Sequence, residues 1–423
     1  MHKNILTVVG ITILFLGTCI TPSVAVDTIE PSSIPNSNGK TLYVGGTGPN
    51  NYTTIQDAVD NASNGDTVFV YNGTYYENVR VYRAINLIGE NKYTTIINGR
   101  DSHREVIEIN TVNVKISGFT IQKSNDEGIV CYDWSNLIIE GNIIRDNAGH
   151  GICFDLIFDD CRNNIITNNI ITNNDNGVDI ELHIGPYHYD ITIDITICNN
   201  IIINNDYGIK IEGSRGYPIT NNITIYNNII TNNDDGIYLD EAENIIIRDN
   251  NITNNNDGIR LYRAEQNTIR DNTITNNNEG IILDHSDQNT ISDNNIINNL
   301  FGLNSYNSIM NYISKNNFIG NMRNAYFSIS WIYIVDTLIN PNTWDSNYWD
   351  NWKGNGTKII FGGLSREGII LFFIGIEFNI IYLIFKFRFE EPPYSRGRKF
   401  GKIPLLQFDR NPAKEPFDIE GVI

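Results

Sequence analysis

A glycine that recurs every 22 residues in the middle of the chain is the feature that most constrains the fold. The interval between successive glycines of the series is 22 residues in its last three repeats and ranges from 23 to 31 residues before them. The series consists of Gly128, Gly151, Gly177, Gly208, Gly236, Gly258, Gly280 and Gly302. Short runs that alternate apolar and polar residues fill each interval. A repeat of this length and pattern is typical of a solenoid.

Asparagine occupies 65 of the 423 positions and keeps a fixed phase with these glycines. Asn250, Asn272 and Asn294 share one offset, and Asn255, Asn277 and Asn299 share another, while Ile and Leu fill positions between them. High Asn and Ile content disfavours helices. In a parallel β-helix, equivalent residues of successive coils stack at about 4.8 Å, so these offsets become columns. We therefore predict about ten coils with interior Ile and Leu columns and buried, structural asparagine ladders.

The two ends of the repeat region have sequences suited to capping. Residues 53–64 predict a short amphipathic helix with Ile55, Ala58, Val59 and Ala62 on one face, capped by Thr53 or Thr54. At the other end, "NTWDSNYWDNW" supplies aromatic residues that can cover the last coil. We predict a β-helix with its N-terminal cap over residues 41–340 and a C-terminal capping region over residues 341–423.

Two apolar segments bear on localisation. Residues 1–25 match a secretory signal peptide cleaved after Ala25, with an uncleaved membrane anchor as the alternative, and residues 26–40 are a Pro- and Ser-containing linker. Residues 368–385 approach the length of a membrane span, although Glu377 and Asn379 oppose insertion. The alternative for that segment is β-structure packed on the solenoid end. We expect a secreted or cell-surface protein, with membrane anchoring through 368–385 left open.

Charge and cysteine content exclude other classes. A formal net charge of −19 argues against a nucleic-acid-binding protein. Cys131, Cys153, Cys161 and Cys198 follow the apolar N-terminal segment, and their spacing contains neither a CxxC motif nor a disulfide framework. We expect buried thiols.

Several motifs together resemble a known family. The stretch "TIQDAVDNASNGDTVFVYNGTYYENV", the N-x-I-x-x-N-x-x-G-I-x-L coils, "NYWDNW" and "NPAKEPFDI" resemble NosD-like, pectin-lyase-like proteins over residues 41–350 and the terminal "PAKEPFDI". The resemblance implies a right-handed parallel β-helix and a carbohydrate-binding or sugar-hydrolysing module. It also implies a copper-binding role in cofactor maturation.

The residues do not supply a complete set for either implied chemistry. "GHG" at 149–151 and the acid pair Asp159–Asp160 occur in the reverse order from related hydrolases, and Arg260 is the one outward arginine of a regular coil. For copper, Met310 and Met322 are not clustered. His183, His188 and Asp190 lie close together in the sequence and form a candidate metal site, with solvent-exposed histidines as the alternative.

One offset of the repeat gathers carboxylates on the outside. Because the first and third positions after each glycine point inward, the second and fourth point outward. The fourth position supplies a column of Asp155, Glu181, Glu212, Asp240, Tyr262 and Asp284. Tyr238 and Arg260 lie beside it. This edge admits calcium or is simply an acidic solvated surface.

The leading hypothesis is an exported scaffold that binds a polysaccharide or cell-surface glycan along this column without catalysis. The alternatives are a polysaccharide-active hydrolase or lyase and a NosD-type copper-binding maturation protein.

Overall fold

The computed structural model is a right-handed parallel β-helix, as predicted. It describes residues 39–156, 160–183, 192–213, 220–330, 333, 336, 339–353, 357–365, 404–409, 411–417 and 419. The predicted signal peptide, the predicted linker as far as residue 38, and segment 368–385 lie outside the described residues. Among the helices that the structure describes, none has the length and apolar character needed to cross a membrane.

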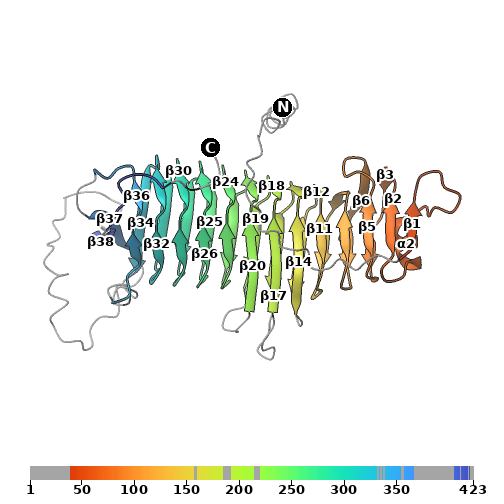
Figure 1. The fold of residues 1–423 in the computed structure, drawn as a ribbon, viewed down its shortest axis with the longest axis horizontal. Helices are drawn as coiled ribbons and strands as arrows, with labels where there is room; N and C mark the ends of the chain where they lie inside the picture. The colour runs from red at the N-terminus through yellow and green to blue at the C-terminus, as the bar shows by residue number, and fades with distance from the viewer. Residues whose placement is uncertain are drawn as a thin grey trace, which may run out of the picture. The chain divides into compact units, whose positions relative to one another are not determined.

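Three parallel sheets, named sheets I, II and III here, run along the stack (Figure 1). Sheet I contains β4 (Val79–Val81), β7 (Ile107–Ile109), β10 (Ile129–Cys131), β13 (Ile152–Leu156), β16 (Asn176–Leu182), β19 (Tyr207–Glu212), β22 (Asp235–Asp240), β25 (Asp257–Tyr262), β28 (Glu279–Asp284), β31 (Phe301–Tyr306), β34 (Arg323–Ser330) and β37 (Lys358–Ser365).

Sheet II contains β1 (Thr41–Val44), β2 (Thr67–Val70), β5 (Asn86–Gly89), β8 (Lys115–Ser117), β11 (Ile138–Glu140), β14 (Cys161–Thr167), β17 (Thr192–Cys198), β20 (Thr220–Tyr226), β23 (Ile246–Arg248), β26 (Thr268–Arg270), β29 (Thr290–Ser292), β32 (Tyr312–Ser314), β35 (Thr343–Asp345) and β38 (Pro404–Asp409). The antiparallel pairing of β37 with β38 joins sheets I and II at the C-terminal end.

Sheet III contains β3 (Gly73–Tyr75), β6 (Thr95–Ser102), β9 (Thr120–Ser124), β12 (Ile143–Arg145), β15 (Ile170–Thr172), β18 (Ile201–Ile203), β21 (Ile229–Thr231), β24 (Asn251–Thr253), β27 (Thr273–Thr275), β30 (Asn295–Ile297), β33 (Asn317–Ile319) and β36 (Tyr348–Trp349). These twelve strands exceed the expected ten coils, because the first coils have the fold without the asparagine repeat. The parallel ladder also continues past residue 340, through β35 and β36.

The repeated glycine marks the tightest approach between successive coils. A Cβ on Gly258 would lie 2.5 Å from the carbonyl oxygen of Gly280, a distance that no side chain tolerates. The following residues alternate as predicted, since Ile259 and Leu261 are fully buried while Arg260 and Tyr262 face outward. The glycine therefore permits close stacking, and the alternation separates the core from the outer surface.

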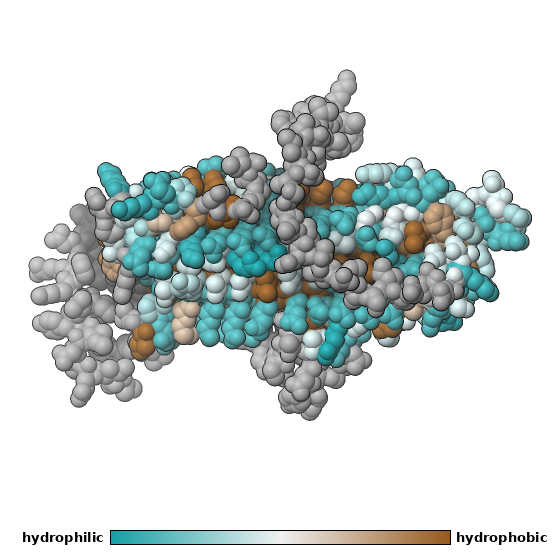
Figure 2. Space-filling view, in the orientation of Figure 1, coloured by the Kyte–Doolittle hydropathy of each residue, from teal (hydrophilic) through white to brown (hydrophobic). Residues whose placement is uncertain are grey.

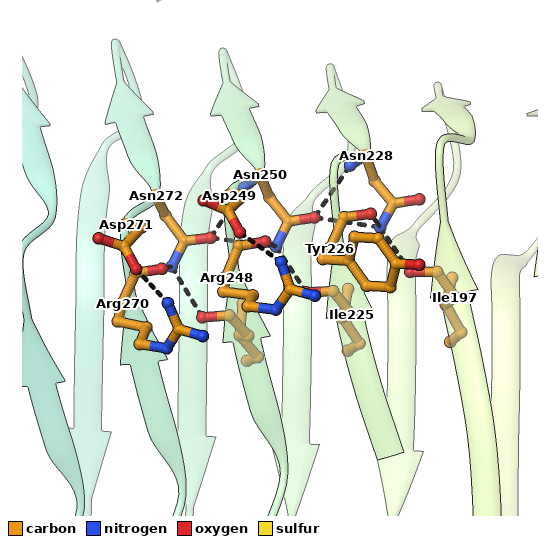
Figure 3. A network of polar contacts seen from close by, with 11 residues as sticks. Ile197, Ile225, Tyr226, Asn228, Arg248, Asp249, Asn250, Arg270, Asp271 and Asn272 are labelled. Carbon is orange, nitrogen blue, oxygen red and sulfur yellow. Dashed lines mark hydrogen bonds and ion pairs between the residues drawn. The ribbon is translucent and has the colours of Figure 1, made fainter. Parts of the chain in front are cut away.

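Buried asparagines form hydrogen-bonded ladders at the corners between sheets (Figure 3). The Oδ1 atom of Asn272 accepts hydrogen bonds from both the backbone N–H and the side-chain amide of Asn250, each at 3.0 Å. Asn272 in turn donates from both groups to the Oδ1 atom of Asn294, and its amide also reaches the carbonyl oxygen of Ile247 in the preceding coil. Each side chain thus satisfies backbone groups that a corner would otherwise leave unpaired.

Three ladders run through the described residues. The first contains Asn142, Asn169, Asn200, Asn228, Asn250, Asn272, Asn294, Asn316 and Asn347. The second contains Asn147, Asn174, Asn205, Asn233, Asn255, Asn277, Asn299 and Asn321. A third contains Asn267, Asn289, Asn311 and Asn342. The predicted columns are therefore buried and structural.

In the first two ladders, the residue before each asparagine takes the left-handed backbone conformation. Asn227, Asn232 and Asp271 have φ angles of 55°, 56° and 57°. Asn and Asp tolerate this conformation better than other non-glycine residues. The recurring Asn-Asn and Asp-Asn pairs therefore combine a residue that turns the chain with one that bonds the next coil.

A C-terminal aspartate terminates the first ladder. The buried carboxylate of Asp409 accepts hydrogen bonds from the backbone and amide of Asn347 and from the indole Nε1 of Trp349. Trp349 stacks on Phe318 with ring centroids 4.4 Å apart. Of the aromatic residues predicted to cover the last coil, Trp344 and Trp349 are buried. Asp409 supplies the acceptor that a further asparagine would otherwise provide.

The predicted N-terminal helix is α2 (Ile55–Asn61), at the opposite end of the stack (Figure 1). Thr54 caps it by accepting a hydrogen bond from the backbone N–H of Asp57. The Glu77 carboxylate accepts hydrogen bonds from the backbone N–H groups of Ile55 and Gln56. Ile55, Ala58 and Val59 are fully buried, so this helix covers the apolar interior.

Replacing Asn272 with Leu should lower the free energy of unfolding. Leu removes the acceptor for two donors of Asn250 and the donor for the carbonyl oxygen of Ile247. An unsatisfied buried polar group costs about 1–3 kcal/mol. Urea unfolding measures the change, and the exposed Asn278→Leu variant is the control. A midpoint equal to that of the control would contradict the structural role of the ladder.

Replacing Val59 with Asp should detach α2 and expose the first coil. A carboxylate cannot be buried in this apolar contact without a partner. We expect a lower melting temperature and concentration-dependent aggregation, measured by light scattering, because open solenoid ends associate. The exposed Asp60→Ala variant should remain monodisperse. A stable, monodisperse Val59→Asp variant would show that the cap is dispensable.

Candidate functional site

The predicted outer column lies on sheet I and forms one continuous row. The strand register pairs Asp155 with Glu181, Glu181 with Glu212, and Glu212 with Asp240. It continues from Asp240 to Tyr262 and from Tyr262 to Asp284. All six side chains are partly exposed. The structure therefore brings together all six residues that the sequence placed in this column.

A second outer column runs beside the first. The register aligns Asp179, Lys210, Tyr238 and Arg260 on successive coils. The phenol of Tyr238 donates a hydrogen bond to Asp240 at 3.2 Å, which links the two columns. The guanidinium of Arg260 lies 5.7 Å from the centre of the Tyr238 ring. Burial, followed by the charge of Asp240, raises the pKa of Tyr238, so its phenol stays a donor.

A third column comes from the residue that precedes each repeated glycine. Asn176, Tyr207, Asp235, Asp257 and Glu279 align in register. Tyr207 stacks on Tyr238 of the second column, with ring centroids 5.3 Å apart and planes inclined by 26°. Sheet I therefore carries a three-column outer face that combines aromatic rings with carboxylates.

Two further polar pairs extend this face. Arg263 lies over the Tyr262 ring at 4.9 Å and bridges to Glu241 at 3.2 Å. The Asp284 carboxylate lies 2.7 Å from the His285 ring Nδ1, and His285 Nε2 contacts the Asn307 amide at 3.0 Å. These pairs hold Tyr262 and Asp284 in place.

Asp257 is a buried carboxyl in the third column. It lies between Asp235 and Glu279 on neighbouring coils, and Arg260 approaches it at 3.7 Å. Burial, followed by the charges of Asp235 and Glu279, raises its pKa to about 7, while Arg260 opposes the shift. This carboxyl therefore exchanges its proton near neutral pH.

Asp179 of β16 is the most deeply buried acid of the face, with no exposed side-chain surface. Its Oδ2 atom lies 3.3 Å from Nε2 of His150 and accepts a hydrogen bond from the Asn176 amide. Glu181 Oε1 lies 3.9 Å from the same His150 nitrogen. Burial raises the pKa of Asp179 to about 6, although His150, Lys210 and Asn176 lower it.

His183, immediately after β16, joins the same group. Its Nε2 atom lies 3.0 Å from Glu181 and 3.6 Å from Asp155. Burial raises the pKa of Asp155, and the facing His183 opposes that shift. His188 and Asp190, the other members of the predicted metal site, lie outside the described residues.

A second acidic group lies closer to the N-terminus. The carboxylates of Glu105, Asp126 and Glu127 have oxygens within 4.8 Å of one another. Burial and a hydrogen bond with Asp126 raise the pKa of Glu127 to about 7. Sharing protons in this way relieves the repulsion between like charges.

Comparison with protein families gives a match over most of the chain. The family described as "Periplasmic copper-binding protein (NosD)" matches residues 59–222 and 188–354. The chain belongs to the NosD family. None of the curated proteins matches it significantly.

Solved structures confirm the fold of this NosD-family chain. The A-module of the Azotobacter vinelandii mannuronan C-5 epimerase AlgE6 is 18% identical, with a TM-score of 0.53 over 65% of this chain and 84% of that module. The AlgE4 A-module is also 18% identical, with a TM-score of 0.52 over 64% and 92% of the two chains. The Dettilon tailspike protein gp208 is 13% identical, with a TM-score of 0.51 over 69% and 64%.

The family description raises the question of whether the described residues fit copper. Cu⁺ favours thiolate and thioether ligands. The four described cysteines are buried, and burial raises the pKa of the Cys161 thiol to about 12, which keeps it protonated. Met310 and Met322 are exposed and lie at different corners, Met310 between β31 and β32 and Met322 between β33 and β34. The described residues therefore lack the soft ligand cluster that Cu⁺ requires.

The sequence missed the third column and the role of His150. In the sequence, His150 stands out only as part of the hydrolase-like "GHG" motif, and no motif marks Asp179, Tyr207, Asp235 or Asp257 as functional. The signal was available, because each of the third-column residues immediately precedes a repeated glycine. Only the fold shows that the residue before each repeated glycine and the second residue after it face the same outer surface of sheet I.

Replacing Asp257 with Asn should stabilise the protein above pH 7. An unfolded Asp titrates near 3.8, whereas folded Asp257 titrates near 7. Between these values the folded state binds more protons, so the contribution of this group to stability falls as pH rises from about 4 to 7. Urea unfolding at pH 5 and pH 8 measures the free energy of unfolding. Between these two pH values it should fall less in Asp257→Asn than in wild type.

The exposed Asp60→Asn variant should retain the wild-type pH dependence. An identical pH dependence in wild type and Asp257→Asn would exclude a raised pKa at this carboxyl.

Proposed function

We propose that this exported NosD-family protein binds an extended glycan along the outer face of sheet I. The observation that carries the proposal is the register that aligns Glu212, Asp240, Tyr262 and Asp284 beside Tyr238 and Arg260. Because successive coils lie about 4.8 Å apart, one offset of the repeat supplies a regular series of contacts. A linear polymer with repeating units suits such a series better than a compact ligand.

The chemistry of the face matches that of sugars. The stacked Tyr207 and Tyr238 rings offer apolar area, and the neighbouring carboxylates accept hydrogen bonds from hydroxyl groups. Arg260 and Lys210 are the cations that lie within these columns. Figure 2 shows a predominantly hydrophilic surface with smaller apolar groups on the face in view.

Charge favours a neutral glycan. The net charge is −19, and the first column alone contains five carboxylates. These charges repel a polyanion and attract hydroxyl-rich or cationic chains. Binding should therefore change little with salt, in contrast to recognition of a charged polymer.

Catalysis on the same polymer is the second candidate function. Asp179 and Asp257, with pKa values raised by burial to about 6 and 7, can accept or donate protons at neutral pH. Mannuronan C-5 epimerases, which share the fold, act on mannuronan. Product analysis during the binding experiments separates this candidate from binding alone, with mass spectrometry to detect cleavage and NMR to detect epimerisation, which leaves the mass unchanged.

The triple variant Asp240→Asn, Tyr262→Ala, Asp284→Asn should lose glycan retention. A panel of neutral polysaccharides in affinity electrophoresis identifies a ligand that retards the wild-type protein. We expect retention to fall by at least about tenfold, since the variant loses a stacking surface and two acceptors.

The matched control changes an outward column of sheet III, in which Thr231, Thr253 and Thr275 align in register. Replacing these three residues with Ala should leave retention unchanged. Full retention by the folded sheet I variant, or no retention of the wild type by any glycan, would contradict the proposal.

A further inference from the structure

One cluster on sheet I has fewer hydrogen bonds than its burial requires. The Oδ2 atom of Asp179 faces Asn176 and His150, but its Oδ1 atom is buried without a hydrogen-bond partner. Nδ1 of His150 and Oδ1 of the buried Asn176 are also without hydrogen bonds. Leaving such atoms unpaired is costly, especially for a carboxylate with no exposed surface.

The donor atoms are arranged as a metal site would require. One ligand atom each from His150, Asp179 and Glu181 lies within 4.8 Å of the others. Glu181 and Asp179 are two residues apart on β16 and therefore project from the same outer face, while His150 comes from the preceding coil. The strand register, rather than a mobile loop, holds the two carboxylates.

We propose that His150, Asp179 and Glu181 bind a divalent cation, with the unpartnered oxygen of Asn176 as a neighbouring acceptor. An imidazole nitrogen with two carboxylates is a mixed nitrogen and oxygen set, which suits Zn²⁺ or Mn²⁺. His183 lies against Glu181 and stabilises its orientation. The site does not depend on glycan binding.

The cations that surround the cluster define the competing explanation. Lys210 faces Asp179 from the next coil and also pairs with Glu212. His150 lies 3.6 Å from Asp175 as well. If Lys210 and a protonated His150 alone neutralised Asp179, the cluster would have no need of a metal. Removing Lys210 therefore separates the two explanations, since its positive charge repels a bound cation.

The proposed ligands also distinguish this site from one for Cu⁺. The cluster contains neither thiolate nor thioether. Cu²⁺ should compete with Zn²⁺ here, because it binds more tightly to nitrogen and oxygen ligands generally, whereas Cu⁺ should not. Comparing Cu²⁺ with Cu⁺ as competitors of Zn²⁺ therefore tests the ligand set.

Equilibrium dialysis of the full chain against Zn²⁺, with metal measured by mass spectrometry, tests the proposal. We expect one saturable equivalent in the wild type. His150→Gln and Asp179→Asn should each weaken binding by at least about tenfold, since they remove ligands. Lys210→Gln should bind more tightly than wild type. His285→Asn is the matched control, because His285 also faces an aspartate, Asp284, on sheet I.

Circular dichroism establishes that each variant is folded. If Asp179→Asn is unfolded, the test rests on His150→Gln. The His150 side chain is partly exposed, so its replacement should leave the fold intact. The proposal is overturned if wild type retains no Zn²⁺, or if folded His150→Gln retains it with unchanged affinity. Weaker Zn²⁺ binding in Lys210→Gln, or tight Cu⁺ binding lost in His150→Gln, would also overturn it.

Discussion

The hydrogen bond from one asparagine to the next is the interaction on which the rest of the structure depends. Asn250 donates to Asn272 and Asn272 donates to Asn294, with main-chain and side-chain donors converging on one oxygen. Corners of a β-helix interrupt the strand ladders and leave buried backbone groups that need partners. The asparagines supply those partners in the coils from Asn142 to Asn347, so these corners stack in fixed register. The regularity of the sheets follows from that register.

Fixed register turns a position in the repeat into a surface. Glu212, Asp240 and Asp284 are far apart in sequence, yet they belong to one column because each follows its glycine by the same number of residues. The same rule places like charges close together. Raised carboxyl pKa values at Asp179 and Asp257 are the electrostatic consequence, since burial and neighbouring acids both disfavour ionisation. Stacking therefore creates both the proposed glycan-binding face and the raised pKa values of its buried carboxyls.

The family description and the described residues point to different ligand chemistry. The NosD family is described as periplasmic and copper-binding, but the four cysteines that the structure describes are buried. Cys131 and Cys161 occupy inward positions of β10 and β14, where a small apolar side chain fits. The polar groups that could hold a cation are instead an imidazole and carboxylates on the outer face. Membership of the family therefore does not by itself fix the ligand, which depends on the side chains at the surface.

The sequence by itself determined the coil, the inward and outward positions, the asparagine ladders and the outer column from Asp155 to Asp284. It could do so because each coil places the same kinds of residue at the same distances from its repeated glycine. Where a contact does not follow these distances, only the tertiary structure decided the outcome. The repeat that separates His150 from Asp179 is longer than the regular 22 residues. The contact between their side chains depends on how β13 and β16 align across the loop between them. Asp409 ends the first ladder from the far C-terminus, a contact between Asn347 and a residue outside the repeat. Such contacts have no period in the sequence, because they arise from the folding of one coil onto another.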